Sequence, residues 1–416
     1  MIRVSTNMPV NDMQQSIRRQ EERMYGLQGQ IGAQTRLLSL RDDPIAASQA
    51  VRYDSYLARL NRFEDNVKYA QDHFNSTHDN LLSATNILHR MRELAVAGAN
   101  GTYSPDDLKI MAVEVNELLK ELVSISNALG ADMKQLFSGD KVFTEPFRIV
   151  QGNVEGGTET MITRVEYRGA GATRQVEIGD NMFIDLDISG GEAFWAEKMM
   201  IFSSVDATDY RVQEQGAFFI DGVEIKVNIG DTLPAVVAKI NDSGAPVKAY
   251  IDINTRGLVI EGTSAHLIRA EDKIGGAAVL RDLGIIDGNM VNNAPNWASS
   301  ARVAGGSMFD MVIRLRDGLL RGDHDFIGSL GIAGMDLALN NVTLKLTDIS
   351  SRKERADVAW QRINQQIPNV TRMLDRETGL DLPTTALELK KAEIAHQAIL
   401  STAGRLLPKS LLDFLR

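Results

Sequence analysis

Cysteine is absent from the 416-residue sequence. Its absence excludes disulfides, thiolate zinc sites and cysteine nucleophiles. It also suits a chain that leaves the cell unfolded, because stray thiols would crosslink on the way. Aromatic residues make up only 6% of the chain, which favours thin helical cores over one large globular core.

A surplus of basic residues and long apolar runs are also missing. The 45 Lys and Arg residues are outnumbered by 55 Asp and Glu, so the net charge is -10 and we expect no nucleic-acid partner. No run approaches the roughly 18 apolar residues of a membrane span, so we expect no membrane insertion. The first twenty residues lack the apolar segment of a secretory signal, so any export is expected to use another route.

Motifs for catalysis or metal binding are not found either. His73 and His78 are five residues apart, so they do not share a helix face as paired ligands would, and we expect both to be solvated. Asp185 begins a calcium-loop pattern, but its twelfth position is Ala196, where a Glu is needed. The sequence therefore predicts no catalytic, cofactor or metal site and a protein that is not an enzyme. A secreted enzyme with its activity in residues 141–304 is a less favoured alternative.

What the sequence does contain is apolar residues at alternating spacings of three and four, the pattern of helices that pack along a seam. The seam in residues 13–38 includes two glutamines, and three glycines interrupt the same stretch, so this helix is expected to be marginal alone. In residues 53–95, twelve of thirteen seam positions are apolar, against about six expected from composition. This predicts a helix of about 65 Å. After a break at residues 98–101, a third seam in residues 108–129 predicts an antiparallel neighbour.

Short alternating or β-branched runs occupy residues 141–304 and predict an inserted α+β domain. Residues 218–225 indicate a hairpin around Asp221-Gly222, and residues 247–261 indicate a second strand pair closed by Arg256-Gly257. A short helix is expected at about residues 232–241.

Helical periodicity returns near residue 308. The seam in residues 335–374 contains one charged residue, and Pro368 within it is expected to kink or end the helix. Gly379 and Pro383 mark a break before a last amphipathic helix in residues 384–407.

A long seam exposes a stripe that another helix must cover, so the N- and C-terminal helices are expected to pack together. The predicted fold class is mainly α with an inserted α+β domain, in which the two terminal segments form a long-helix coiled-coil bundle. The expected domains are residues 1–44 with 384–416 for coiled-coil assembly, residues 45–140 with 305–383 for a helical bundle, and residues 141–304 for a β-rich outer domain.

Both helical ends carry short motifs whose order resembles the flagellin superfamily, over about residues 1–140 and 305–416. The motifs are Arg36-Leu37, Asp42-Asp43-Pro44-Ile45-Ala46-Ala47, Arg92-Glu93-Leu94-Ala95-Val96, Asn100-Gly101-Thr102, Leu136-Phe137-Ser138-Gly139 and Ser410-Leu411-Leu412-Asp413-Phe414-Leu415. The Asp-Asp-Pro step and the Leu-Leu-Asp-Phe-Leu ending resemble the junction proteins of that superfamily more than its filament flagellins.

The resemblance implies an inner helical tube built from the terminal segments, a surrounding bundle and an outward domain. It implies a structural component of the bacterial flagellum, an adaptor at the hook-filament junction that is exported by the flagellar type III apparatus. The implied partners are identical subunits in a ring, the hook-side junction protein, flagellin and an export chaperone at the C-terminal helix. The implied location is outside the cell, or the periplasm where flagella are periplasmic. A filament flagellin subunit is the alternative within the same superfamily.

Assembly contacts are expected along the seams of the two terminal segments. The predicted interface residues are Met13, Ile17, Met24, Leu27, Ile31, Leu38, Leu389, Ile399, Leu406, Leu411, Leu412, Phe414 and Leu415.

Overall fold

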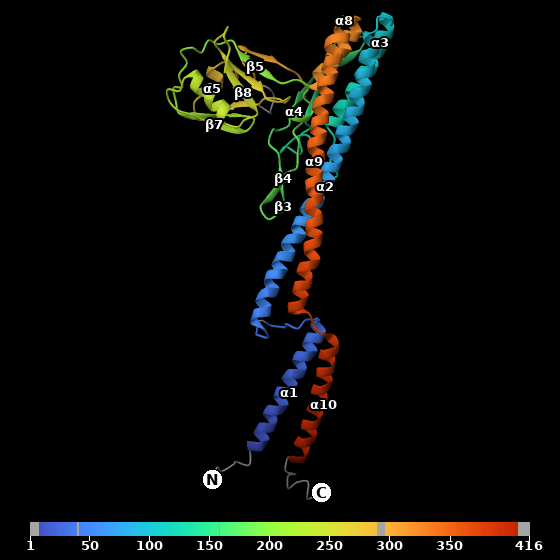
Figure 1. Ribbon diagram of the computed structural model, residues 1–416, viewed down its shortest axis with the longest axis vertical. Helices are drawn as coiled ribbons and strands as arrows, with labels where there is room; N and C mark the ends of the chain where they lie inside the picture. Colours follow the sequence, from blue (N-terminus) through green and yellow to red (C-terminus); the bar gives the residue numbers. More distant parts are fainter. Residues whose placement is uncertain (1–7, 40, 158, 289–295, 407–416) are drawn as a thin grey trace. The chain divides into compact units, whose positions relative to one another are not determined.

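The computed structural model describes residues 8–39, 41–157, 159–288 and 296–406. Contacts divide the chain into two compact units, a terminal unit of Met1–Asp65 with Trp360–Arg416 and a central unit of Asn66–Ala359. Long helices at both ends of the chain flank a strand-rich insertion (Figure 1), which confirms the predicted fold class. The finer predicted domains stay a prediction. No helix in the described ranges is long and apolar enough to span a lipid bilayer.

The terminal unit is built from two helices and the ends of two others. Its elements are α1 (Met8–Ala33), the first part of α2 (Pro44–Ala99), the last part of α9 (Ile332–Thr378) and α10 (Leu382–Leu406). The helices α1 and α10 pack side by side (Figure 1), as expected for the two ends of the chain. Between them, Gln20 Nε2 donates a 2.9 Å hydrogen bond to the Ala392 carbonyl.

The turn between α1 and α2 is held by local hydrogen bonds. Asp42 Oδ2 accepts from the Leu38 and Ser39 amides at 2.9 and 2.8 Å. Asp43 Oδ1 accepts from the Ala46 amide at 3.1 Å, so Asp43 caps a helix whose first residue is Pro44.

The helices of the central unit form a bundle around a buried core. They are the remainder of α2, α3 (Pro105–Ser126), α7 (Met308–Arg321), α8 (His324–Phe326), the π-helical turn η1 (Ile327–Gly331) and the remainder of α9. Capping boxes start α3 at Ser104 and α7 at Ser307, each with an aspartate at the third helical position. The helix α3 packs on α7.

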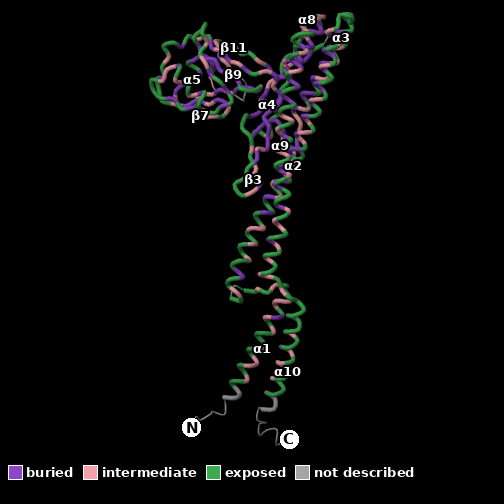
Figure 2. The backbone as a smooth tube through the Cα atoms, viewed as in Figure 1, coloured by how far each residue is buried: buried purple, intermediate pink, exposed green. Residues whose placement is uncertain are grey.

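Five aromatic side chains fill the centre of this unit, where the bundle meets the first strands. The rings of Phe147, Phe194 and Phe309 lie with centroids 5.0 to 5.8 Å apart, and all three side chains are completely or almost completely buried. Phe137 and Tyr167 join them at 4.9 and 5.0 Å. Figure 2 shows this part of the tube as mostly buried.

The strands form four small antiparallel sheets. Two are the pairs β1 (Phe147–Asn153) with β2 (Thr160–Tyr167) and β3 (Gln175–Gly179) with β4 (Met182–Asp185). The other two, with strand orders β11-β5-β9-β8 and β10-β6-β7, make up an outer lobe. Its strands are β5 (Met200–Ser203), β6 (Gly216–Ile220), β7 (Val223–Val227), β8 (Val247–Ile251), β9 (Leu258–Gly262), β10 (Ala270–Asp272) and β11 (Ala301–Ala304). Short helices α4 (Gly190–Ala193), α5 (Leu233–Asp242) and α6 (Val279–Asp282) complete the region.

Both predicted hairpins are confirmed. Strands β6 and β7 pair around Asp221 and Gly222, whose φ angles of 50° and 82° match a type I′ turn. Strands β8 and β9 also pair, and Arg256 in their connection has a φ of 54°. The predicted short helix corresponds to α5.

Two helix ends differ from the prediction. The helix α9 continues through Pro368 to Thr378, so the expectation that this proline could end the helix is wrong. Proline removes one backbone hydrogen bond, but Ile363 and Val370 stay buried on either side of it, so side-chain packing holds the helix together. The first helix ends at Ala33, because Gln34 takes a positive φ of 53°, and Leu38 therefore lies in the turn.

Candidate assembly surfaces

The terminal helix pair buries few of its apolar side chains. Only Leu27 among the predicted interface residues is buried, with 9% of its surface exposed, and Leu38 is exposed. The half-buried ones are Met13, Ile17, Met24, Ile31, Leu389 and Ile399. The side chain of Leu406, together with Leu411, Leu412, Phe414 and Leu415, lies outside the described residues. In Figure 2, α1 and α10 are almost entirely exposed or intermediate.

A second apolar set on this pair was missed by the sequence analysis. Tyr25 on α1 is 73% exposed, and α10 exposes Leu387, Ile394 and Leu400. The heptad pattern picks out one apolar stripe on each helix, so apolar residues on the other sides were not counted. In a pair of helices each helix covers only one side of the other, and those residues stay exposed. Because burying a side chain such as Leu contributes about 1.5–3 kcal/mol, these open faces favour binding of further helices.

A third surface, also missed, is an uncharged seam on α9 and the turn before it. Its positions are spaced alternately by three and four residues: Leu330, Ala333, Leu337, Asn340, Leu344, Thr347 and Ser351. Every exposed residue from Gly328 to Ser351 is uncharged, although 24% of the whole chain is charged. We refer to these seven residues as the α9 seam.

The charged residues in this stretch form ion pairs within the chain. Asp336 pairs with Arg92 of α2, and Lys345 pairs with Glu192 of α4 at 2.8 Å. Asp348 pairs with Arg352 at 2.7 Å, and the Asp336 and Asp348 side chains remain 47% and 43% exposed. The opposite face of the helix is the predicted seam, with Met335, Val342 and Ile349 fully buried. The helix therefore has one buried apolar face and one face of uncharged residues that the described part of the chain leaves exposed.

The helix α3 exposes a smaller apolar patch beside acidic residues. Ile110 and Val113 are 69% and 52% exposed. Glu114 pairs with Arg90 at 2.8 Å, while Glu117 and Glu121 lie further along the exposed side. The central unit thus carries apolar residues on two separate exposed helix faces, on α3 and on α9.

A buried ion cluster joins α2 to the segment after β4. Asp187 is 1% exposed and lies 2.7 Å from an Arg174 guanidinium nitrogen and 3.2 Å from His73 Nε2. Burial acts to raise the pKa of Asp187, but hydrogen bonds from Arg174 and His73 outweigh it and hold that pKa below its usual range. The prediction that His73 is solvated is therefore wrong, since Asp187 covers it.

Nearby, Asp132 accepts a 2.8 Å hydrogen bond from the Tyr69 hydroxyl and pairs with Lys134 at 3.0 Å. Burial acts to raise its pKa, but Lys134 and Tyr69 lower it to about 2. These groups hold the loop after α3 against α2. In the described part of the chain, no three His, Asp or Glu side chains are grouped as ligands for a metal ion.

Comparison with known proteins identifies the helical end. Residues 4–142 match the family model of the bacterial flagellin N-terminal helical region. Flagellar hook-associated protein 3 of Escherichia coli is 27% identical over 178 residues, which cover 43% of this chain and 55% of that protein. Over this helical end the chain is therefore similar to flagellins and to flagellar hook-associated protein 3.

A second known protein is similar over the same kind of partial span. A flagellin of Listeria monocytogenes is 29% identical over 126 residues, which cover 30% of this chain and 44% of the relative. The chain thus spans about half the length of the curated relatives it matches. The crystal structure of flagellar hook-associated protein 3 from Legionella pneumophila is 17% identical, with 78% of this chain and 97% of that chain covered and a TM-score of 0.46.

The region that matches the family model includes α1, α2 and α3. The α9 seam and the exposed residues of α10 lie beyond it.

Proposed function

We propose that this chain is a structural subunit of the bacterial flagellum, an adaptor at the hook-filament junction whose identical copies associate through helix faces. The α9 seam carries the proposal, because an exposed row of uncharged residues along six helical turns suits burial against another helix. The half-covered pair of α1 and α10 supports it, since both helices keep apolar side chains open to partners.

The size of the α9 seam fits a polymer better than a free dimer. Residues 330–351 span about 32 Å of helix, and a stripe about 10 Å wide along it offers roughly 300 Å². A stable pairwise interface buries about 800 Å² on each partner. One such contact is therefore weak, and stable association needs several contacts per subunit, as a ring provides.

The further partners are part of the proposal. The hook-side junction protein and flagellin would bind at the two ends of the ring, and an export chaperone would bind the C-terminal helix before assembly. The exposed apolar residues of α10 support a helical partner there. The location would be the flagellum outside the cell, or the periplasm in a bacterium with periplasmic flagella.

The test places charge in the α9 seam. Leu337→Glu with Leu344→Glu changes only exposed positions, so the purified chain should keep its unfolding midpoint. In a strain that depends on this copy, we expect loss of filament attachment and of motility. The control is Ile253→Glu in the β8–β9 connection, which is 92% exposed and should leave both unchanged. Normal filaments with the doubly charged seam would refute a role for this face.

A filament flagellin is the second candidate, favoured by the 29% identity to the Listeria monocytogenes flagellin. Immunogold labelling of isolated flagella separates the two. Gold confined to the hook-filament boundary supports the junction adaptor, whereas gold along the whole filament supports the flagellin.

A further inference from the structure

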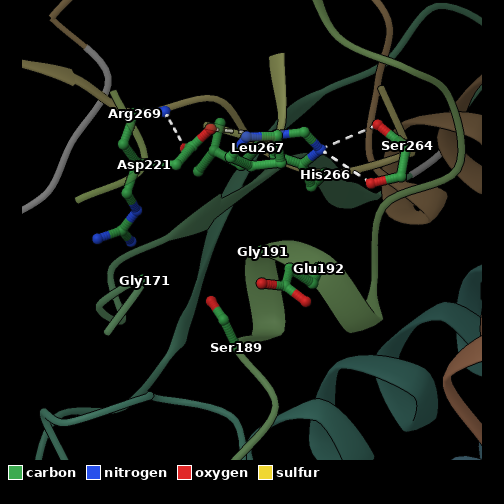
Figure 3. A pocket seen from close by; sticks show the side chains of 10 residues that line it. Gly171, Ser189, Gly191, Glu192, Asp221, Ser264, His266, Leu267 and Arg269 are labelled. Carbon is green, nitrogen blue, oxygen red and sulfur yellow. Dashed lines mark hydrogen bonds and ion pairs between the residues drawn. The ribbon is translucent and has the colours of Figure 1, made fainter. Parts of the chain in front are cut away.

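A buried histidine joins two parts of the outer lobe close to where the lobe contacts α4. His266 lies in the connection between β9 and β10 and is 4% exposed. Its Nε2 atom is 3.2 Å from Asp221 Oδ2, at the β6–β7 turn. Its Nδ1 atom is 2.9 Å from the Ser264 carbonyl oxygen and 3.3 Å from the Ser264 hydroxyl. Figure 3 shows Asp221, His266 and Ser264 in a row beside a cavity of about 180 Å³.

The two acceptors determine which form of the imidazole fits. A neutral imidazole donates from one ring nitrogen only, and the other nitrogen is an acceptor. Here one nitrogen faces a backbone carbonyl and the other a carboxylate, and neither of these can donate. The imidazolium, with a proton on each nitrogen, donates to both partners. A neutral imidazole protonated at Nε2 could accept at Nδ1 from the Ser264 hydroxyl at 3.3 Å, but its lone pair would then face the closer Ser264 carbonyl oxygen at 2.9 Å.

Asp221 also binds Arg269, and Arg269 and Leu267 attach the 264–269 segment to residues outside the lobe. Asp221 Oδ1 accepts from the Arg269 amide at 2.8 Å, and the Asp221 amide donates to the Arg269 carbonyl at 2.9 Å. The Arg269 guanidinium donates to the Gly169 carbonyl and lies over the Tyr167 ring. The Leu267 amide donates to the Gly191 carbonyl of α4 at 2.9 Å.

Helix α4 is in turn bound to α9. Asn341 Nδ2 donates to the Glu192 and Trp195 carbonyls at 2.8 and 2.7 Å, and Lys345 pairs with the Glu192 carboxylate. Contacts therefore run from the β6–β7 turn through the 264–269 segment and α4 to the helix that carries the α9 seam.

We propose that His266 is a proton-dependent clasp, which holds the β6–β7 turn to the 264–269 segment at the base of the outer lobe while both of its ring nitrogens are protonated and loosens this contact when one proton leaves. The charged groups around it come from three other places. Asp221 from the β6–β7 turn and Glu192 from α4 favour the cation, whereas Arg269 on the same segment opposes it. Lys345 of α9 is paired with Glu192 and partly offsets that carboxylate.

The direction of the pH dependence follows from these groups. Burial acts to lower the pKa of His266, but the hydrogen bond and charge of Asp221, the Ser264 carbonyl and Glu192 outweigh it and raise that pKa above 6.5. A histidine whose pKa is raised by folding stabilises the structure fully below its unfolded pKa of about 6.5. That stabilisation is lost as the pH rises through the folded pKa. The β6–β7 turn should therefore loosen from the 264–269 segment in mildly alkaline solution and stay attached in mildly acidic solution.

Hydrogen exchange of the full-length chain tests the clasp. Exchange rates, corrected for the intrinsic effect of pH, are measured for peptides covering residues 216–227 and 263–270 at about pH 5.5 and about pH 9, on either side of the histidine range. We expect protection in both peptides to fall at the higher pH, about tenfold for each unit by which folding raises the pKa of His266. His266→Gln should remove this change, and His89→Gln, at an exposed position on α2, should keep it. Equal protection at both pH values in the unaltered chain would overturn the clasp.

A second measurement covers the case in which His266→Gln does not fold. Asp221→Asn keeps the side-chain shape but removes the negative charge, and NMR of labelled histidine side chains reports each imidazole directly. The proposal expects His266 to titrate at higher pH than the exposed histidines and to move down in the Asp221→Asn variant. An unchanged His266 titration in that variant would refute the assigned pair. Neither measurement depends on flagellar assembly, so failure of the clasp and failure of the junction role are distinguishable.

Discussion

The two units carry the same kind of seam but bury it to different extents. In the central unit, α2, α3, α7 and α9 surround a common core, and side chains such as Phe74, Leu88 and Leu119 are completely buried. Among residues 11–33 and 382–402 of the α1–α10 pair, whose side chains are described, only Leu27, Thr385 and Ala392 are buried. A seam therefore becomes a core only when more than one helix covers it. The central unit finds those helices within its own chain, whereas the terminal pair still has open faces.

The largest expected effect lies in the aromatic core of the central unit. Phe309→Ala leaves a cavity against Phe147 and Phe194, so we expect the free energy of unfolding to fall by about 3–5 kcal/mol. Urea unfolding followed by circular dichroism measures this. A loss below 1 kcal/mol would show that the core of this unit is no better packed than the terminal pair.

The buried ion cluster should come next. Asp187→Asn leaves Arg174 and His73 facing a neutral amide, and we expect a loss of about 2–3 kcal/mol, below the value for a fully buried pair because Arg174 is partly exposed. The folded pKa of Asp187 is lowered, so its stabilisation is present above about pH 4 and is lost as the pH falls through the folded pKa. Urea-unfolding midpoints are measured at a series of decreasing pH values. As the pH falls, the midpoint should decrease less in the Asp187→Asn variant than in the unaltered chain. The neighbouring Asp185→Asn, at an exposed pair with Gln175, serves as the control.

A smaller effect on stability is expected in the terminal pair. Leu27→Ala removes the most buried side chain of α1, but the pair is open on its other sides, so we expect about 1–2 kcal/mol. Hydrogen exchange in residues 11–33 should increase, while exchange in α3 should not change. If exchange in α3 also increased, the two units would unfold together and the comparison between them would fail.

The smallest effect, and one of opposite sign, tests the glycines of α1. An added Cβ at Gly26 meets no atom within 4 Å, so Gly26→Ala should stabilise the helix by about 0.5–1 kcal/mol. At Gly29 the same change places Cβ 2.9 Å from Leu38 Cδ1 and should gain less. Helicity measured at 222 nm on heating compares the two variants. Equal gains would show that the Leu38 contact does not constrain the turn.

The elements that could be predicted from the sequence are those that depend on residues close together in the sequence. Caps at Asp43 and Ser104 and the turn at Asp221-Gly222 are local, and the structure contains each of them. The long seams also predicted the long helices and the pairing of the two chain ends, because a periodic apolar face requires another helix to cover it.

What could not be predicted depends on residues brought together by folding. His73 is buried because Arg174 and Asp187 arrive from distant positions, and no pattern around His73 signals them. The open side of α9 was missed for a different reason. Its leucines at 330, 337 and 344 are a heptad in the sequence, but which face of the helix stays uncovered depends on where α2, α3 and α7 pack.

The outer lobe leaves and rejoins the rest of the central unit through neighbouring strands. Met200 at the start of β5 pairs with Ala304 at the end of β11, so the two crossing points lie about one strand spacing apart, near 5 Å. Because the two ends of the lobe are adjacent, the lobe is a replaceable insertion. A foreign domain whose own termini are adjacent could be inserted there without changing the spacing of the helices. If the chain forms a polymer, a domain inserted at this point would be displayed once on every subunit.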